Sequence, residues 1–215
     1  MRLLDRLRNA FEKPVPPVGD PEHFSVLRAR AYRELFGGEP IRFLPHEVFE
    51  KPPFGGRIDV HIYELPYERG EGQVQVAVTS GLSDYRMVRP GDGTPCRREI
   101  IQYFRECNGS AVARLHDMAW MPLAARFCLD FFETAGPHPT SGSWPNALFV
   151  PPLVQPHANF KLDLDGDEMQ LLWHVPLSQA ELEFKLKYGL DALLGRMQER
   201  DLPWVFDEST RIALV

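Results

Sequence analysis

Alternating apolar and polar residues predict two β-hairpins in this chain. Residues 57–65 and 73–79 place apolar side chains at every second position, and a polar turn that contains glycine separates them. The same alternation returns in residues 160–164 and 169–175, on either side of Asp165-Gly166. A period of two is typical of strands with one buried face, and Asp-Gly is a favoured dipeptide in tight hairpin turns. Each pair of segments is therefore expected to form an antiparallel hairpin.

Capping signals and helical spacing predict four helices after the N-terminal segment. Asp20 is a typical N-cap and Pro21 a typical first helical residue, while Ser178 and Glu181 form a capping box. Glycine or proline follows three of the predicted ends, where the helical pattern stops. The helices are expected over residues 21–36, 110–134 with a break or kink at Pro122, 179–188 and 190–202.

The order of the predicted elements indicates the fold class. A helix precedes a run of strands that includes residues 41–48 and 97–104, and helices, the second hairpin and two more helices follow. Strands and helices do not alternate strictly, so we expect an α+β fold with a mostly antiparallel mixed sheet and flanking helices. The proline-rich stretch 14–19 divides the chain into an N-terminal helix with its linker, residues 1–19, and one domain, residues 20–215.

Charge is distributed unevenly along the chain. The net charge is −6, and residues 111–215 carry the whole excess of acid, while residues 1–110 are balanced. Neither half is basic, which argues against nucleic-acid binding. The acidic half either keeps the protein soluble or attracts a basic partner, and both interpretations stay open.

The sequence predicts neither secretion nor a membrane span. Asp5, Arg6 and Arg8 interrupt the apolar stretch that a signal peptide needs, and no run approaches about 18 apolar residues. The apolar stripe within residues 3–11 predicts a short helix that docks on the domain or, alternatively, lies on a membrane surface. The three cysteines are too widely spaced for a disulfide framework, so we expect a cytoplasmic protein.

Acidic residues and histidines give no convincing metal site. Asp163, Asp165 and Asp167 resemble the start of a calcium loop, but Glu168 stands where that loop needs glycine. A hairpin turn explains these acids better. The histidines show no spacing typical of zinc ligands, and no phosphate-binding loop occurs. We therefore expect no metal and no cofactor.

Nucleophile motifs are also missing, so we expect no catalytic residues and no enzyme. The serine at position 80 lacks the preceding glycine of a nucleophile elbow. An alternative hypothesis is a hydrolase that uses Asp59 and His61 with Ser80 or Asp84. It requires these groups to lie within hydrogen-bond reach of one another.

A polar corner at residues 78–87 is the most distinctive local feature. A predicted strand runs into Ser80, then Gly81, which permits a positive φ, and then a mixture of acid, aromatic and basic residues. One interpretation is a rigid recognition corner; the other is a structural turn that directs Tyr85 and Met87 into the core. The residues expected to contact a partner are Ser80, Ser83, Asp84, Tyr85 and Arg86.

Three sequence blocks, in order, resemble the suppressor-of-fused family. They are VTSGLSDYRM at 78–87, RREIIQYF at 97–104 and LLWHVPLSQAELEFKLKYGLDALLGRM at 171–197. Residues 58–61 are similar to an early strand of the family, whereas residues 105–160 match it poorly. This resemblance implies a non-enzymatic fold that binds proteins. Animal members have two lobes and hold a transcription-factor peptide as an added strand, and this chain is long enough for the N-terminal lobe alone.

The resemblance also suggests a biological role. Single-lobe members are bacterial, and many are encoded beside polymorphic toxins. The expected function is therefore an immunity-type protein that neutralises a toxin by direct binding. An adaptor that binds a regulatory protein by strand addition is the alternative. Aromatic and arginine side chains are the usual anchors of such interfaces. The candidate anchors are Tyr85, Arg86, Trp144 and Trp173, of which Trp173 is expected to be buried.

Overall fold

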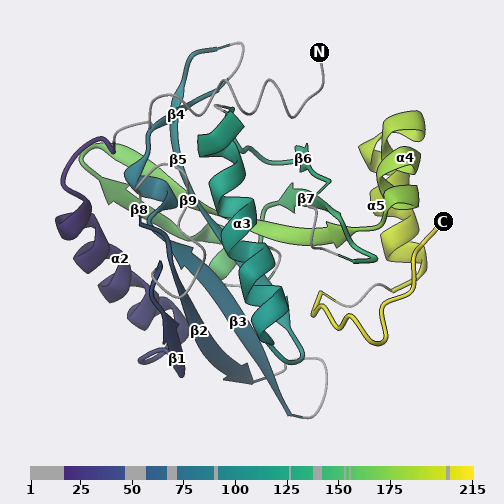
Figure 1. Cartoon of the computed structure of the whole chain (residues 1–215), viewed down its shortest axis with the longest axis horizontal. Helices are drawn as coiled ribbons and strands as arrows, with labels where there is room; N and C mark the ends of the chain where they lie inside the picture. Colours follow the sequence, from purple (N-terminus) through teal and green to yellow (C-terminus); the bar gives the residue numbers. More distant parts are fainter. Residues whose placement is uncertain are drawn as a thin grey trace.

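The described part of the chain forms one sheet covered on both faces (Figure 1). Helix α3 (Gly109–Ala125) lies across one face, and helices α2 (Pro21–Phe36) and α5 (Leu190–Glu199) contribute to the apolar layer on the other. The predicted α+β class with a mostly antiparallel mixed sheet is confirmed. The computed structural model describes residues 17–46, 57–66, 72–89, 92–125, 127–137, 142–152, 154, 156–201 and 204–215; the expected N-terminal helix lies outside them.

No helix within these described ranges is apolar over a length that would cross a membrane.

The sheet is antiparallel except at its centre. Its strands follow the order β1-β2-β3-β5-β9-β7-β6, with β4 beside β5 and β8 beside β9. Strands β5 and β9 are parallel, and every other pair of named strands is antiparallel. The strands are β1 (Arg42–Leu44), β2 (Asp59–Pro66), β3 (Gln73–Ser80), β4 (Met87–Val88), β5 (Pro95–Phe104), β6 (Thr134–Ala135), β7 (Asn146–Val150), β8 (Lys161–Leu164) and β9 (Asp167–Leu177).

The helices begin where the capping signals predict. Asp20 accepts hydrogen bonds from the backbone of Glu22 and His23, and Gly37 ends the helix with a left-handed φ of 77°. The capping box of Ser178 and Glu181 is also present. The helices are α2 (Pro21–Phe36), α3 (Gly109–Ala125), α4 (Gln179–Tyr188) and α5 (Leu190–Glu199), and the 3₁₀ turns are η2 (Leu82–Asp84) and η3 (His157–Asn159).

Helix α3 ends well before residue 134, where the sequence predicts its end. Pro122 lies inside the helix near this end, and a proline there removes a backbone donor. Beyond the helix, Cys128 and Leu129 still enter the core, but they do so from an irregular segment. Their apolar spacing therefore reflects burial of a loop rather than continuation of the helix.

Both predicted hairpins are confirmed, as β2–β3 and β8–β9. The sequence does not predict β7, because all five of its residues are buried and no alternation marks them. Strand β1 is shorter than expected, and residues 47–48 of that prediction lie outside the described ranges. The parallel pairing of β5 with β9 joins segments far apart in the chain, which local patterns cannot reveal.

Two apolar layers sandwich the sheet. One layer packs α3 against the sheet through residues such as Val112 and Leu115. The other packs α2, α5 and the C-terminal segment against the opposite face, and it contains Phe24, Trp173 and Leu193. Each fully buried large side chain stabilises the fold by about 1.5–3 kcal/mol relative to exposure. These layers hold the ends of β3, β5 and β9 in place, and the candidate site is built there.

Protonation of His157 is expected to destabilise the protein in acid. Its Nδ1 atom lies 2.8 Å from the hydroxyl of Tyr103, and its ring packs edge-on against Phe36. Burial lowers the pKa of His157 to about 4, below its ordinary value of 6.5. The unfolded chain therefore binds this proton first as pH falls, so stability present above about pH 6.5 is lost towards pH 4.

The expected loss from His157 is about 2 kcal/mol between about pH 7.5 and pH 4.5. Urea unfolding at both pH values should show this difference in the wild type and a smaller one in His157→Gln. The control is His23→Gln, because His23 is exposed on α2. An equal pH dependence in His157→Gln and His23→Gln would contradict the prediction.

Candidate functional site

The polar corner begins where β3 ends, at Ser80. Gly81 follows with a φ of 134°, a backbone conformation that residues with a side chain rarely adopt. A Cβ atom at this position would overlap the carbonyl oxygen of Arg57. Glycine is therefore required here both by its backbone angle and by the close approach of the backbone at Arg57. The 3₁₀ turn η2 then directs Ser83 and Asp84 inward.

Glu99 on β5 organises the backbone of this corner. One carboxylate oxygen accepts from the amides of Gly81 and Ser83 at 2.8 and 3.0 Å and from the Ser83 hydroxyl at 2.7 Å. The other oxygen accepts from the Thr79 hydroxyl at 2.6 Å. The Glu99 side chain is fully buried. A buried carboxylate with this many donors fixes the turn in one conformation.

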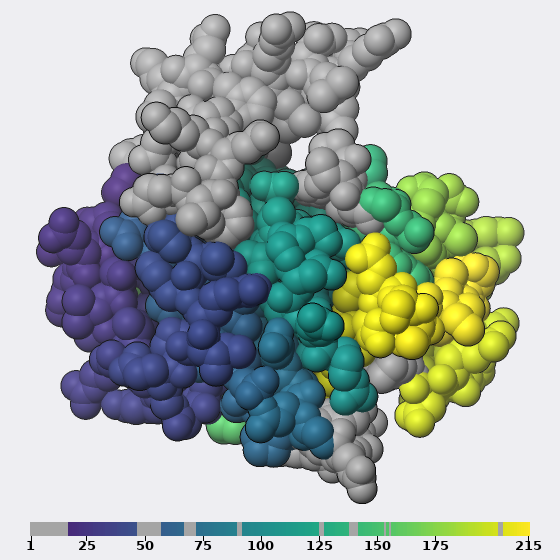
Figure 2. Space-filling model, turned by 60° about the horizontal axis from the view of Figure 1, so that its bottom comes forward, coloured from purple at the N-terminus to yellow at the C-terminus, as the bar shows by residue number. Residues whose placement is uncertain are grey.

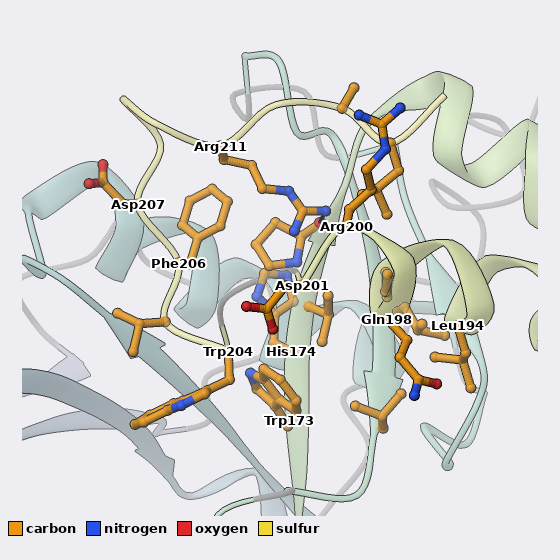
Figure 3. A pocket seen from close by; sticks show the side chains of 18 of the residues that line it. Trp173, His174, Leu194, Gln198, Arg200, Asp201, Trp204, Phe206, Asp207 and Arg211 are labelled. Carbon is orange, nitrogen blue, oxygen red and sulfur yellow. Dashed lines mark hydrogen bonds between the residues drawn. The ribbon is translucent and has the colours of Figure 1, made fainter. Parts of the chain in front are cut away.

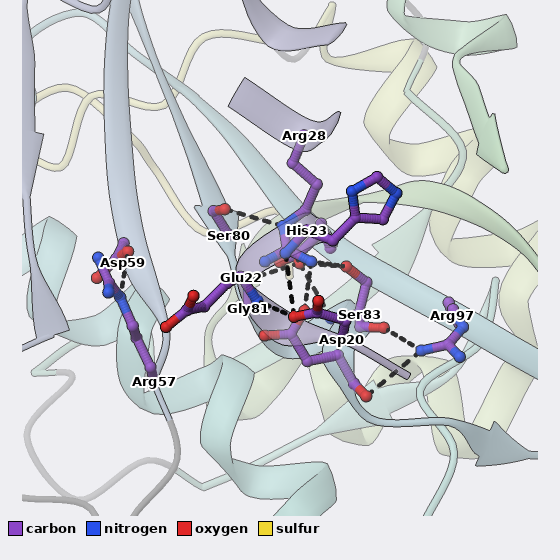
Figure 4. A network of polar contacts seen from close by, with 12 residues as sticks. Asp20, Glu22, His23, Arg28, Arg57, Asp59, Ser80, Gly81, Ser83 and Arg97 are labelled. Carbon is purple, nitrogen blue, oxygen red and sulfur yellow. Dashed lines mark hydrogen bonds and ion pairs between the residues drawn. The ribbon is translucent and has the colours of Figure 1, made fainter. Parts of the chain in front are cut away.

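Arg28 reaches the same corner from α2 (Figure 4). Its guanidinium donates to the hydroxyls of Ser80 and Ser83 at 2.9 and 3.0 Å and to the Asp84 carboxylate at 2.5 Å. It also lies 3.7 Å from the Glu99 carboxylate. Only 1% of Arg28 is exposed. The cation therefore faces two carboxylates, and we call Arg28, Ser80, Ser83, Asp84 and Glu99 the corner network.

Burial and charge act in opposite directions within the corner network. Burial alone would lower the pKa of the Arg28 guanidinium, but the carboxylates of Glu99 and Asp84 outweigh it and raise that pKa. Burial raises the pKa of Asp84 to about 6, and the neighbouring Arg28 opposes this change. The charges are thus held by their partners, and removal of one partner would leave the others uncompensated.

Arg97 on β5 holds the corner from its other side. Its guanidinium donates to the carbonyl oxygens of Ser83 and Val18 at 2.7 and 3.1 Å. Its Nε atom donates to the Asp167 carboxylate at 3.1 Å. Two buried arginines, from α2 and β5, therefore link this corner to the N-terminal part of the domain and to the β8–β9 hairpin.

Four of the five predicted partner-binding residues are buried. Ser80, Ser83, Asp84 and Tyr85 are at most 5% exposed, and the structure gathers the first three around Arg28. Tyr85 packs edge-on against Trp120, and Met87 is also buried, so the alternative of a structural turn that supplies the core is confirmed. Partner binding by the corner stays a prediction. Arg86 is the one member of the five whose side chain is substantially exposed, at 43%.

Of the proposed hydrolase residues, Asp59 is engaged by neighbouring groups, whereas the Nδ1 atom of His61 is buried without a hydrogen-bond partner in the described structure. The Asp59 carboxylate accepts from the amide of His46 at 2.9 Å and from the Arg57 guanidinium at 3.0 Å. Burial lowers the pKa of His61, which packs edge-on against Phe43. Across the described ranges, no side-chain hydrogen bond joins Asp59 or His61 to Ser80 or Asp84, although Asp59 and Ser80 are paired residues of adjacent strands.

The acidic turn between β8 and β9 is a hairpin with arginine partners. Asp163 accepts from the amide of Gly166, which closes the turn. Asp167 forms ion pairs with Arg86 at 2.9 Å and with Arg97 at 3.1 Å. In the part of the chain that the structure describes, no cluster of three acidic, histidine or cysteine side chains is arranged to hold a metal.

Two of the candidate anchors are buried tryptophans. Trp173 is 9% exposed, as expected from its strand position. Trp144, another candidate anchor, is 4% exposed, with the Arg211 guanidinium 4.9 Å above its ring. The tryptophan lies in a loop that the C-terminal segment covers, and only the folded chain reveals this cover.

The C-terminal segment, residues 204–215, packs along the surface beside α3, α4 and α5 (Figure 2). Arg114 on α3 pairs with Glu208 at 3.4 Å. Glu181 on α4 accepts from the Arg211 guanidinium at 3.0 Å and from the amide of Leu214 at 3.2 Å. The segment forms one wall of a cavity of about 1020 Å³ that the sequence gives no sign of.

Glu181→Ala is expected to lower the free energy of unfolding by about 2–3 kcal/mol, since it removes a capping box and leaves the buried Arg211 without its ion pair. Hydrogen exchange should rise along residues 207–215. Glu183→Ala is the control, because Glu183 is exposed on the same helix; its expected effect is within about 0.5 kcal/mol. Equal effects of the two substitutions would contradict the assigned role of Glu181.

The sequence matches the family model described as "Suppressor of fused protein (SUFU)" over residues 56–209. The chain belongs to the suppressor of fused family. The match includes the corner at 78–87 and the blocks at 97–104 and 171–197, and it begins after α2. In this suppressor-of-fused chain, the corner network therefore includes Arg28, a residue outside the matched range. A comparison with curated proteins finds no significant match.

Solved structures of suppressor-of-fused proteins share this fold. A homologue from Neisseria gonorrhoeae is 14% identical, with a TM-score of 0.61, and the match covers 90% of this chain and 98% of that one. A chain of the Sufu–Fu complex is 12% identical, with a TM-score of 0.61 and coverage of 94% and 93%. Drosophila Suppressor of Fused is 11% identical, with a TM-score of 0.55, over 73% of this chain and 42% of that one.

Proposed function

We propose that this suppressor-of-fused domain acts by binding another polypeptide and carries out no catalysis. The observation that carries the proposal is the state of the corner network: its charged and hydroxyl groups are buried and bonded to one another. Such groups are engaged in holding a fold and are not poised around a reacting atom. A structure with the same fold comes from a Sufu–Fu complex, which supports a protein as the partner.

The specific role we propose is that of an immunity-type protein that neutralises a toxin by covering it. Its acidic C-terminal half favours a basic partner, because complementary charge accelerates encounter. The three cysteines are buried and form no disulfide, although the Cys96 and Cys128 sulfurs lie 2.8 Å apart, and a reducing cytoplasm would keep this pair as thiols. Tight neutralisation requires an interface of roughly 1,600 Å².

Products of neighbouring genes offer the test of this role. Purified neighbours are titrated into the domain by calorimetry, and each is expressed in cells with and without the domain. The proposal predicts one neighbour that arrests growth, binds the domain directly and is neutralised by it. Binding to no neighbour, or growth arrest that the domain does not relieve, would contradict the immunity role. Turnover of a hydrolase substrate that is lost in His61→Ala would instead favour the enzymatic alternative.

Arg86 is the residue of the corner that we propose contacts the partner. Arg86→Ala is expected to weaken partner binding at least about tenfold, because exposed arginines are frequent interface anchors. The free energy of unfolding of Arg86→Ala should differ from that of the wild type by less than about 1 kcal/mol, since the Arg86–Asp167 pair is partly exposed. The control is Arg30→Ala, whose exposed side chain pairs with Glu34 on α2. Equal binding by both variants would remove Arg86 from the interface.

An adaptor that binds a regulator by strand addition is the second candidate. Strands β1 and β6 end the sheet, so each has one edge that no named strand covers within the described residues. Phe43 and Ile41 are exposed beside the β1 edge. A peptide added there would gain main-chain hydrogen bonds. Protection of the β1 amides from exchange on partner binding would favour this mode, and unchanged exchange would contradict it.

A further inference from the structure

We infer that the cavity beside the C-terminal segment is a binding site for a polypeptide segment in which apolar residues flank one lysine or arginine. This inference rests on the proposed function, that the domain binds a protein, and it names a site and a chemistry for that binding. The cavity is lined by residues of β7, β9, α5 and the C-terminal segment (Figure 3), and its lining includes no residue of the corner network.

The size of the cavity fits several side chains of a peptide. Its volume of about 1020 Å³ is at the upper end of the range in which drug-sized ligands are buried. Sheet residues such as Leu148 and Trp173 form its floor, and Leu194 and Met197 of α5 form one wall. Because this lining is mostly apolar, burial of apolar side chains supplies the main driving force for binding.

Exposed apolar residues extend this surface beyond the cavity. Phe132 is 47% exposed and Ile212 is 80% exposed, and both line the cavity. Large apolar side chains that stay in contact with water beside a hollow are typical of an interaction site. A peptide would cover them as it enters, whereas a small ligand enclosed by the cavity would leave them exposed.

The charges around the cavity favour a cation. Asp201 lines it, and its carboxylate points inward toward Trp173, whereas Arg200 points away (Figure 3). The other arginine of the lining, Arg211, is neutralised by Glu181 at 3.0 Å. Within the described residues, Asp201 has no ion-pair partner. Asp201 is exposed to solvent beside the apolar lining, so its carboxylate is accessible to a single incoming cation.

Aromatic rings strengthen the same preference. Trp173 and Trp204 both line the cavity on the side that Asp201 faces. Indole faces attract ammonium and guanidinium groups, and aliphatic stems of lysine and arginine pack well on them. The acidic C-terminal half of the chain attracts basic segments over a longer range. The size, the apolar lining and the charge of the cavity therefore all favour a peptide segment with apolar residues around one lysine or arginine.

Selection from a random peptide library tests this inference and does not require the natural partner. A phage-displayed heptapeptide library is selected on the purified full chain, and recovered sequences are synthesised and titrated by calorimetry. The variant is Asp201→Asn, because asparagine tolerates the positive φ of 44° at this position. The matched control is Asp191→Asn, which makes the same change on the exposed side of α5, outside the cavity.

The wild type and Asp191→Asn should recover peptides with lysine or arginine among apolar residues. Asp201→Asn should bind them at least about tenfold more weakly. Norleucine in place of the lysine should weaken binding to the wild type by a similar factor and to Asp201→Asn hardly at all. No enrichment, enrichment of acidic or neutral peptides, or equal binding by the two variants would overturn the inference.

Failure of this inference is distinguishable from failure of the proposed function. If the library yields nothing while a neighbouring gene product binds wild type and Asp201→Asn equally, the domain binds its partner elsewhere. If basic peptides bind through Asp201 and no neighbouring product binds, the cavity is a recognition site and the immunity role is wrong.

Discussion

Arg28→Met is expected to lower the free energy of unfolding by about 3–5 kcal/mol. The loss arises because Asp84 and Glu99 stay buried while the cation between them disappears. Hydroxyls of Ser80 and Ser83 also lose their donor. Urea unfolding at neutral pH measures the difference directly.

The matched control for Arg28→Met is Arg30→Met, two residues along α2. Arg30 is exposed and pairs with Glu34, so its loss should cost less than about 1 kcal/mol. In Arg28→Met the deficit should shrink as pH falls through the pKa of Asp84, because a protonated Asp84 no longer needs the cation. Similar stabilities of the two variants would show that the corner network is not what holds α2 to the sheet.

Gly81→Ala is expected to cost about 3–4 kcal/mol or to prevent folding. Its added methyl group would overlap the Arg57 carbonyl, and its φ of 134° is unfavourable for alanine. Gly72→Ala separates these two effects, because Gly72 also has a positive φ, of 98°, but has open space around it. We expect Gly72→Ala to cost about 1–2 kcal/mol.

Thermal and urea unfolding of the two alanine variants measure this difference. An excess cost in Gly81→Ala reports the close approach between the corner and the chain at residue 57. If both variants lose the same stability, the backbone angle alone explains the glycine, and the tight contact contributes nothing.

Local patterns were sufficient for elements whose signals lie within a few residues. Asp20 and Gly37 delimit α2 because caps act on adjacent amides and carbonyls, and the β8–β9 hairpin follows from alternation around Asp165-Gly166. Strand β7 could not be predicted, because burial on both faces erases alternation. The parallel pairing of β5 and β9 depends on contacts between distant segments.

The candidate site, too, could be predicted only where its signals are local in the sequence. The sequence identifies residues 78–87 as a special corner, since glycine and serine at a strand end indicate an unusual turn. It does not reveal that Arg28, more than fifty residues earlier, completes the corner from α2. For this reason the direction of Ser80, Ser83 and Asp84, inward rather than toward a partner, was beyond prediction. The cavity cannot be predicted from local patterns either, because segments far apart in the sequence form its walls.

Amide hydrogen exchange at Gly81 and Ser83 tests most directly whether the polar corner at residues 78–87 is a rigid structural turn. Both amides donate to the buried Glu99 carboxylate, at 2.8 and 3.0 Å. They should therefore exchange as slowly as central strand amides such as Ile101, through global unfolding. Exchange of Gly81 and Ser83 within seconds at neutral pH, as in an open loop, would contradict a scaffold role and return the corner to the binding surface.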